Sequence, residues 1–177
     1  MPGLDFLHDP ARFALATNKT QEPFNGCTIG KYCNIHHSAM LGINAFSYVL
    51  NNNGESIPIP QNKSVSIGNY VDIGAMAIIC RGSWRDTLIS DHVKIGNKTY
   101  IGHNVSIGPR TLIGVNVHVS GSTDIGSDVY IAPCACIKDY IKIGNKSIIG
   151  FGAVVIKDVP KGTTVIGNPA KELLHAK

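Results

Sequence analysis

Histidine and cysteine are the residue types in this sequence whose side chains could act as bases, nucleophiles or metal ligands near neutral pH. The chain contains seven histidines and five cysteines. The cysteines form an odd set without a C-x-x-C pair, which argues against a disulfide framework and against a zinc knuckle. We therefore expect reduced, mostly packed thiols. A single histidine is more often structural or solvated than catalytic, so the elements that position each one must be identified first.

Composition restricts the class of protein. The 177 residues suit one domain, and 19 glycines with 44% apolar, 7% aromatic and 16% charged residues disfavour both disorder and a helical bundle. A net charge of +4 with scattered basic residues is too mild for a nucleic-acid binder but suits an anionic small molecule. No apolar run approaches the ~18 residues of a membrane span, and no secretory signal is present, so we expect a cytoplasmic protein.

A six-residue repeat dominates the chain. An aliphatic residue stands at every sixth position, namely Ile89, Ile95, Ile101, Ile107, Ile113, Val119, Ile125, Ile131, Ile137, Ile143, Ile149 and Val155. This period matches neither an amphipathic helix nor a hairpin meander, whereas β-branched residues suit short strands and glycine suits the bends between them. Three such strands close a triangular coil of eighteen residues, so residues eighteen apart are predicted to stack. The first and fifth positions of each hexad then point inward.

Two insertions interrupt the repeat. Residues 43–64 contain apolar segments on either side of an Asn-Asn-Asn-Gly run and predict a projecting hairpin. The step from Ile79 to Ile89 is four residues too long, which predicts a bulge around residues 83–86.

Two terminal segments flank the coils, which we expect over residues 65–167. Residues 1–22 are expected to form an N-terminal cap segment with a short helix after Asp9 and Pro10. Asn168 and Pro169 give the same signal for a short C-terminal helix within residues 168–177. Because no linker divides the chain, residues 1–177 are expected to form a single domain.

His103 is the histidine that the repeat places most favourably for chemistry. It occupies the third position of the hexad that begins at Ile101, and therefore a corner of the coil, where a ligand in a groove could reach its imidazole. Gly121 follows eighteen residues later, so its backbone is expected one coil above the same corner.

These features together resemble the hexapeptide-repeat acyltransferases, whose fold is a left-handed parallel β-helix that assembles as a trimer. Between residues 41 and 125 the order of IPIPQ (57–61), RGSWRDT (81–87), HNV (103–105) and GS (121–122) is similar to that in UDP-3-O-acylglucosamine N-acyltransferases of lipid A synthesis. That resemblance implies that His103 is the catalytic base and that the backbone N–H of Gly121 binds the oxyanion. The fold class we expect is all-β, with the projecting hairpin and the short C-terminal helix added to the left-handed parallel β-helix.

The C-terminal sequence resembles a different group, the acetyl-CoA-dependent sugar acetyltransferases, through IGFGAVVIKDVP (149–160) and VIGNPAK (165–171). In those enzymes coenzyme A lies between adjacent subunits against corner backbones and basic residues. The resemblance implies acetyl-CoA as a co-substrate, with no permanently bound cofactor. The implied coenzyme A contacts are Gly121, Pro133, Phe151, Lys157, Lys161 and Lys171.

The acceptor is expected beside the 83–86 bulge. The candidate acceptor-binding residues are Arg81, Trp84, Arg85, Asp86 and Asn104. Trp84 could instead have a packing role. Asn104 could hold His103, hold a substrate, or favour the left-handed corner conformation, and the sequence leaves these three roles open.

The sequence therefore predicts a homotrimeric enzyme with active sites between subunits that N-acetylates a nucleotide-linked amino sugar for surface polysaccharide or glycan synthesis. The alternatives are O-acetylation of a sugar or small alcohol and longer-chain N-acylation of the lipid A type. The lipid A enzymes have an extra N-terminal domain, a second histidine where this chain has Tyr140, and an acidic residue where it has Gly96.

Two other classes of protein fit the sequence less well. A β-helical carbonic anhydrase requires two zinc-binding histidines five residues apart, which the histidine spacings here do not supply, so no metal site is expected. A non-catalytic scaffold would leave His103, Gly121 and the C-terminal motif unexplained.

Overall fold

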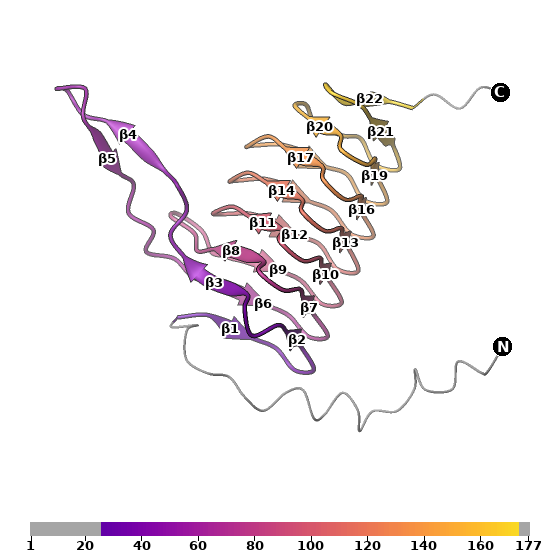
Figure 1. The fold of residues 1–177 in the computed structure, drawn as a ribbon, viewed down its shortest axis with the longest axis horizontal. Helices are drawn as coiled ribbons and strands as arrows, with labels where there is room; N and C mark the ends of the chain where they lie inside the picture. The colour runs from indigo at the N-terminus through magenta and orange to yellow at the C-terminus, as the bar shows by residue number, and fades with distance from the viewer. Residues whose placement is uncertain (1–25, 174–177) are drawn as a thin grey trace.

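The computed structural model describes residues 26–173, which form a triangular coil of short strands (Figure 1). The N-terminal helix expected after Asp9 lies outside the described residues. Within residues 26–173 the secondary structure consists of strands and turns.

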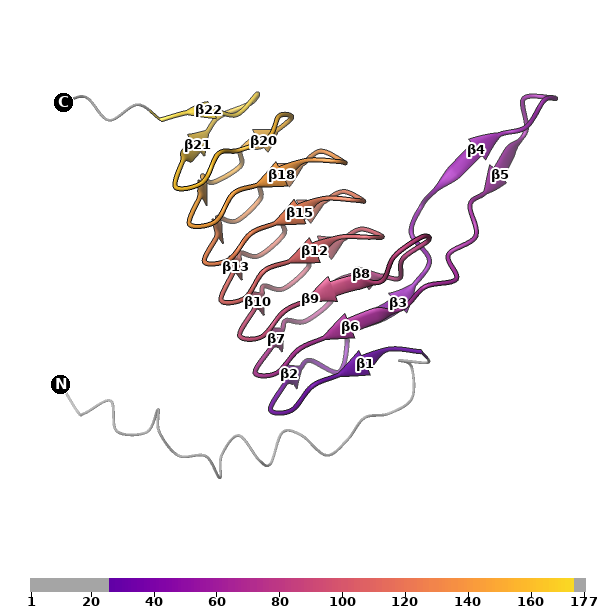
Figure 2. The same ribbon diagram turned by 180° about the vertical axis from the view of Figure 1, so that it is seen from behind.

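Three sheets form the sides of the triangular coil, and Figure 2 shows them from behind. The first sheet has the order β1 (Thr28–Ile29), β6 (Val65–Ile67), β9 (Thr87–Ile89), β12 (Ser106–Ile107), β15 (Asp124–Ile125) and β18 (Lys142–Ile143). The second has the order β2 (Asn34–Ile35), β7 (Asp72–Ile73), β10 (Lys94–Ile95), β13 (Leu112–Ile113), β16 (Tyr130–Ile131), β19 (Ile148–Ile149), β21 (Thr164–Ile166) and β22 (Lys171–Glu172). The third has the order β3 (Met40–Ile43), β8 (Ile78–Cys80), β11 (Tyr100–Ile101), β14 (His118–Val119), β17 (Cys136–Ile137) and β20 (Val154–Val155).

The predicted eighteen-residue stacking is confirmed by the strand register. Ile95 is opposite Ile113 in the second sheet, and Ile107 is opposite Ile125 in the first, each in a parallel pair. At the corners, the fourth residue of the hexad takes the left-handed conformation, with φ of 58° at Asn104 and 58° at Ser122. The corners are therefore equivalent from coil to coil and place side chains in vertical rows.

The core is a column of aliphatic side chains inside the triangle. The first-position residues, such as Ile101 and Ile107, and the fifth-position residues, such as Val105, are fully buried. Short β-branched side chains fill this narrow interior, which explains the low aromatic content.

Replacing Ile107 by alanine is expected to lower the free energy of unfolding by about 2–5 kcal/mol, because it opens a cavity in this column. Ile107 is 0% exposed, whereas Leu88, on the outer face of the same sheet, is 41% exposed. Chemical denaturation of Ile107→Ala beside Leu88→Ala measures the difference. Equal destabilisation by both variants would contradict the assigned inward face.

Both predicted insertions are present. The hairpin consists of β4 (Tyr48–Leu50) paired antiparallel with β5 (Ser56–Pro58) and projects away from the coils (Figure 1). Residues 81–86 form a loop between β8 and β9, at the position of the predicted bulge, and we call it the 81–86 loop.

The predicted C-terminal helix is wrong for the residues that the structure describes. The chain turns at residues 167–170, and β22 then pairs antiparallel with β21, with the N–H of Leu173 donating to the carbonyl oxygen of Thr164 at 2.8 Å. The last parallel strand has an open edge of unpaired backbone groups, and the returning chain satisfies them. This pairing outweighs the local helix signal at Asn168 and Pro169. Residues 174–177 lie outside the described part.

Candidate active site

One corner row of the coil collects the residues expected to act in catalysis. It follows the strands of the third sheet and contains His103, Gly121, Asp139 and Lys157, and we call it the His103 edge. Stacking along this row is direct, because the N–H of Ser122 donates to the carbonyl oxygen of His103 at 2.8 Å. Both insertions also leave the coil from this edge, since each follows a strand of the third sheet (Figures 1 and 2).

His103 is half-buried and lies against the backbone of Gly121. A Cβ atom added at Gly121 would lie 2.6 Å from Nε2 of His103 and 2.8 Å from its Cε1, so glycine is needed there for the ring to occupy its position. Burial lowers the pKa of His103 below its ordinary value of 6.5, and the nearby charge of Asp139 opposes this shift. The imidazole is therefore neutral at pH 7.

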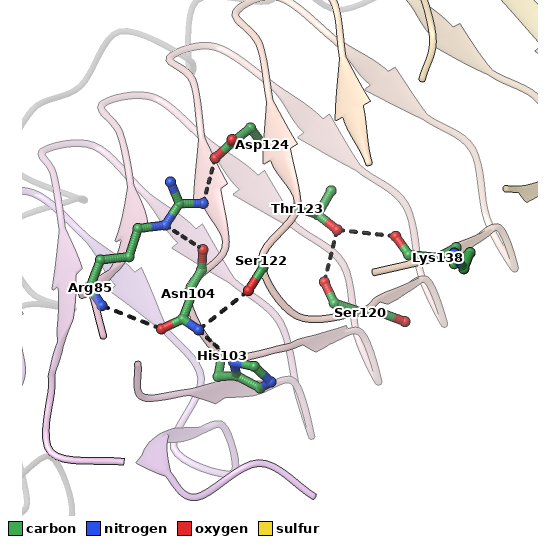
Figure 3. A network of polar contacts seen from close by, with 8 residues as sticks. All are labelled: Arg85, His103, Asn104, Ser120, Ser122, Thr123, Asp124 and Lys138. Atoms are coloured by element: carbon green, nitrogen blue, oxygen red, sulfur yellow. Dashed lines mark hydrogen bonds and ion pairs between the residues drawn. The ribbon is translucent and has the colours of Figure 1, made fainter. Parts of the chain in front are cut away.

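Asn104 joins His103 to the 81–86 loop (Figure 3). Its side chain is fully buried, and its Nδ2 lies 2.7 Å from Nδ1 of His103. Its Oδ1 accepts a hydrogen bond from the backbone N–H of Ser83 at 2.8 Å. Nδ2 also donates to the hydroxyl of Ser122 at 3.3 Å. The Asn104 side chain therefore contacts His103, and its backbone also adopts the left-handed conformation.

Arg85 fixes the position of the loop above the coils. Its Nε donates to the carbonyl oxygen of Asn104 at 2.8 Å, and its guanidinium pairs with Asp124 at 2.5 Å. The guanidinium carbon also lies 4.8 Å from the ring centre of Trp84, in a cation–π contact. Trp84 itself is 59% exposed, so one aromatic ring is presented to solvent beside the site.

Two of the expected acceptor residues have structural contacts instead of open side chains. The carboxylate of Asp86 accepts from the backbone N–H of Ser64 at 2.8 Å, and Nε of Arg81 donates to the carbonyl oxygen of Gly42 at 2.7 Å. These hydrogen bonds fix the ends of the two insertions, where the insertions leave and rejoin the coil. Trp84 is the acceptor candidate whose side chain is open to solvent, and Arg85 lies beside it with its guanidinium paired with Asp124.

The chain is similar to known proteins in both sequence and structure. The chain is 42% identical over 78 residues to a probable UDP-3-O-acylglucosamine N-acyltransferase 2, mitochondrial, of Arabidopsis thaliana, and 44% identical over 77 residues to a UDP-3-O-acylglucosamine N-acyltransferase of Herminiimonas arsenicoxydans. Each match covers 44% of this chain and 26% or 22% of the relative. The chain thus spans about a quarter of these relatives. No protein-family model matches the sequence.

Among solved structures, LpxA from Acinetobacter baumannii superposes with a TM-score of 0.75 at 26% identity, over 84% of this chain and 55% of that one. The chain is similar in sequence and in fold to the hexapeptide-repeat acyltransferases. The acetyltransferase domain of PglB from Neisseria gonorrhoeae, in complex with acetyl coenzyme A, has a TM-score of 0.62 at 27% identity over 80% of this chain and 57% of that one. These likenesses confirm the predicted hexapeptide-repeat fold, a left-handed parallel β-helix.

The expected coenzyme A residues of this hexapeptide-repeat chain lie on different edges. Gly121 and Lys157 are on the His103 edge, whereas Pro133 and Phe151 are on the row after the second sheet, where the N–H of Gly152 donates to the carbonyl oxygen of Pro133 at 3.0 Å. We call that row the Phe151 edge. Lys161 is on the remaining edge and Lys171 is in β22, so one chain does not bring the six together. Lys161 lines an open concavity of about 430 Å³ over the outer face of the first sheet.

Sequence reasoning missed two contributors to the site, Ser122 and Asp124. Ser122 stands eighteen residues after Asn104, so the repeat itself could have predicted its contact with the Asn104 amide. The pairing of Asp124 with Arg85 depends on the path of the 81–86 loop, which carries no repeat signal.

Within residues 26–173, no group of three or more His, Cys, Asp or Glu side chains is placed to hold a metal ion. The described residues also contain no helix long and apolar enough to cross a membrane.

Proposed function

We propose that this protein is a cytoplasmic acyltransferase that moves an acetyl group from acetyl-CoA to the amino group of a nucleotide-linked amino sugar. The observation that carries the proposal is the neutral imidazole of His103 held against the backbone of Gly121 at a partly exposed corner. The relatives named as N-acyltransferases of an acylglucosamine, and the PglB domain in complex with acetyl coenzyme A, support this reaction class.

Acyl transfer requires one group that accepts the proton lost by the attacking nitrogen and another that stabilises the negative carbonyl oxygen. His103 and Gly121 are placed to supply these two groups. The acceptor nitrogen attacks the thioester carbonyl carbon, so that a C–N bond forms and the C–S bond breaks. His103 takes the proton that the nitrogen loses and passes it to the departing sulfur, which leaves as the free thiol. The backbone N–H of Gly121 stabilises the negative carbonyl oxygen of the tetrahedral intermediate. For this base role, Nε2 of His103 must be without a proton when the nitrogen attacks.

The acceptor would bind against the 81–86 loop. The exposed ring of Trp84 offers a flat apolar surface, and the guanidinium of Arg85 over it, which is paired with Asp124, would contact a nucleotide phosphate. Both lie next to Asn104 and thus within the reach of a substrate held at His103.

The donor would occupy a groove between two protomers of a homotrimer. The six expected coenzyme A residues are divided among three edges and β22, so a groove that includes Gly121 and Phe151 requires the His103 edge of one chain and the Phe151 edge of a second. Phe151 is 72% exposed in the single chain, as expected of a residue that a partner or ligand covers. Lys157 is then available to the phosphates of coenzyme A.

Longer-chain N-acylation is the second candidate, because the sequence relatives are named for an acylglucosamine N-acyltransferase reaction. O-acetylation would use the same imidazole on a hydroxyl. The experiment is a matrix of donors (acetyl-CoA, long-chain acyl-CoA and acyl carrier protein thioesters) against UDP-, dTDP- and GDP-linked amino sugars and their hydroxyl analogues, with thiol release as readout. We expect release with acetyl-CoA and an amino sugar. Release only with a long-chain donor, or only with hydroxyl acceptors, would overturn the proposed reaction in favour of the corresponding alternative.

A further inference from the structure

Asn104 is fully buried at a corner of the coil, and its side chain makes several polar contacts. It lies between the 81–86 loop on one side and His103 on the other (Figure 3). Within residues 26–173, the other corner residues with the same backbone conformation lack such a set of contacts. Asn116, for example, has φ of 56°, and within the described residues the hydrogen bond of its side chain is to the sulfur of Cys134, at 3.6 Å.

The orientation of the Asn104 amide follows from its partners. One amide atom is surrounded by the backbone N–H groups of Ser83, Trp84 and Arg85, at 2.8, 3.3 and 3.5 Å. A backbone N–H can only donate a hydrogen bond, so the atom facing all three must be the oxygen. The nitrogen, Nδ2, must then face His103.

The nitrogen of the amide in turn fixes the proton on His103. Nδ2 is a donor only, and its shortest contact, 2.7 Å, is to Nδ1 of the imidazole. Two N–H groups cannot face one another at this distance, so Nδ1 is without a proton. Neutral imidazole has a single N–H, which must therefore be on Nε2. Nε2 is the atom that lies against Gly121, on the side where the acyl group is expected.

We propose that Asn104 is a positioning residue that sets the tautomer of His103. With its oxygen held by the 81–86 loop, Asn104 leaves the proton on Nε2, so His103 first meets the substrate as a hydrogen-bond donor. His103 becomes a base toward the acceptor only when Nε2 has released its proton to solvent and Nδ1 has taken one from solvent, with the amide turned so that its oxygen accepts a hydrogen bond from Nδ1–H. The tautomer assignment is independent of any activity, and its catalytic meaning rests on the proposed function.

The loop that holds the amide is also the loop that carries the acceptor candidates. Turning the amide breaks its bonds to the N–H groups of Ser83, Trp84 and Arg85. A substrate that repositions Trp84 or Arg85 therefore weakens the bonds that keep His103 in the donor tautomer. Acceptor binding and the proton position on His103 are coupled through one side chain.

The charged groups around this arrangement do not determine the tautomer. Asp139 lies near His103 and favours the imidazolium form, while Arg85 and Asp124, next to Asn104, are paired with each other. Neither interaction is a hydrogen bond to a ring nitrogen. Within residues 26–173, the Asn104 amide is the hydrogen-bond partner of Nδ1.

The test is nitrogen-15 NMR of the imidazole of His103 in the intact protein, with Asn104→Asp as the variant. In the unmodified protein above the pKa of His103, we expect the shifts of a protonated Nε2 and an unprotonated Nδ1. The aspartate carboxylate keeps one oxygen for the loop N–H groups and offers the other to Nδ1–H. We therefore expect the proton to move to Nδ1 and the pKa of His103 to rise by about 1–3 units.

Asn116→Asp is the matched control, because it places the same substitution at an equivalent corner that contacts no histidine. It is expected to leave the tautomer and pKa of His103 unchanged. The proposal is overturned if the unmodified protein has its proton on Nδ1, or if folded Asn104→Asp leaves it on Nε2. The measurement on the unmodified protein decides the tautomer even if Asn104→Asp fails to fold.

The catalytic consequence has a separate readout. If the protein transfers acyl groups, the acidic limb of its kcat/KM profile should move to higher pH in Asn104→Asp, by the same amount as the pKa measured by NMR. A limb that stays in place while the pKa moves would overturn the base role of His103 and leave the tautomer assignment intact. The two failures are therefore distinguishable.

Discussion

Replacing His103 by alanine is expected to lower acyl transfer by roughly 10²–10⁴-fold, the usual contribution of a general base. The loss should appear mainly in kcat, because the acceptor is expected to bind through Trp84 and Arg85. Folding should be preserved, since the imidazole is only half-buried at a corner and the aliphatic column lies elsewhere. Steady-state thiol release and the thermal unfolding midpoint measure the two effects.

His118→Ala is the matched control for this variant. The pKa of His118 is also lowered by desolvation, but its side chain is exposed on the outer face of β14 and stacks on Tyr100 at 4.7 Å. We expect it to retain normal transfer. Near-normal turnover in His103→Ala would refute the assignment of the base, whatever the control shows.

Gly121→Ala is expected to lower acyl transfer by roughly 10²-fold or more with little change in stability. The added Cβ would lie 2.6 to 2.9 Å from three atoms of the His103 ring, and this side chain can move aside more cheaply than backbone can. The backbone coil therefore survives, while the imidazole is displaced from its position beside the oxyanion donor. A displacement of about 1 Å is enough for a loss of this size.

Ser127→Ala provides the comparison, because residue 127 has the same third position in its hexad on a corner row away from His103. Transfer activity and unfolding midpoint should both be normal in this variant. Normal transfer in Gly121→Ala would contradict the contact between residue 121 and the imidazole. A large fall in its thermal unfolding midpoint would show that the backbone of the coil, and not the His103 ring, had moved to make room for the added Cβ.

The coil was predictable because one rule repeats. Each buried aliphatic residue, such as Ile107, has the same position in its hexad and points inward. A prediction for one hexad is therefore supported by the hexads on either side, and the register of the strands follows. The hairpin was predictable from its turn residues. The vertical alignment of His103 and Gly121 also follows from the eighteen-residue coil.

The features that the sequence did not predict depend on non-repeating contacts. The signal at Asn168 and Pro169 is local, and it could not show that the open edge of β21 would recruit residues 171–172 as a strand. The contact role of Asn104 depends on the path of the 81–86 loop, which brings three N–H groups to one oxygen. Likewise Asp86 was expected to face an acceptor, but it accepts a backbone N–H of Ser64.

The most direct test of the central claim is mass spectrometry of the acceptor after incubation with deuterium-labelled acetyl-CoA and a nucleotide-linked amino sugar. The account predicts that the label is transferred to the sugar nitrogen by the unmodified protein and that this product is lost, by roughly 10²-fold or more, in His103→Ala. Labelled product that forms equally well with His103→Ala, or no labelled amide with any amino sugar of the UDP, dTDP and GDP series, would contradict it.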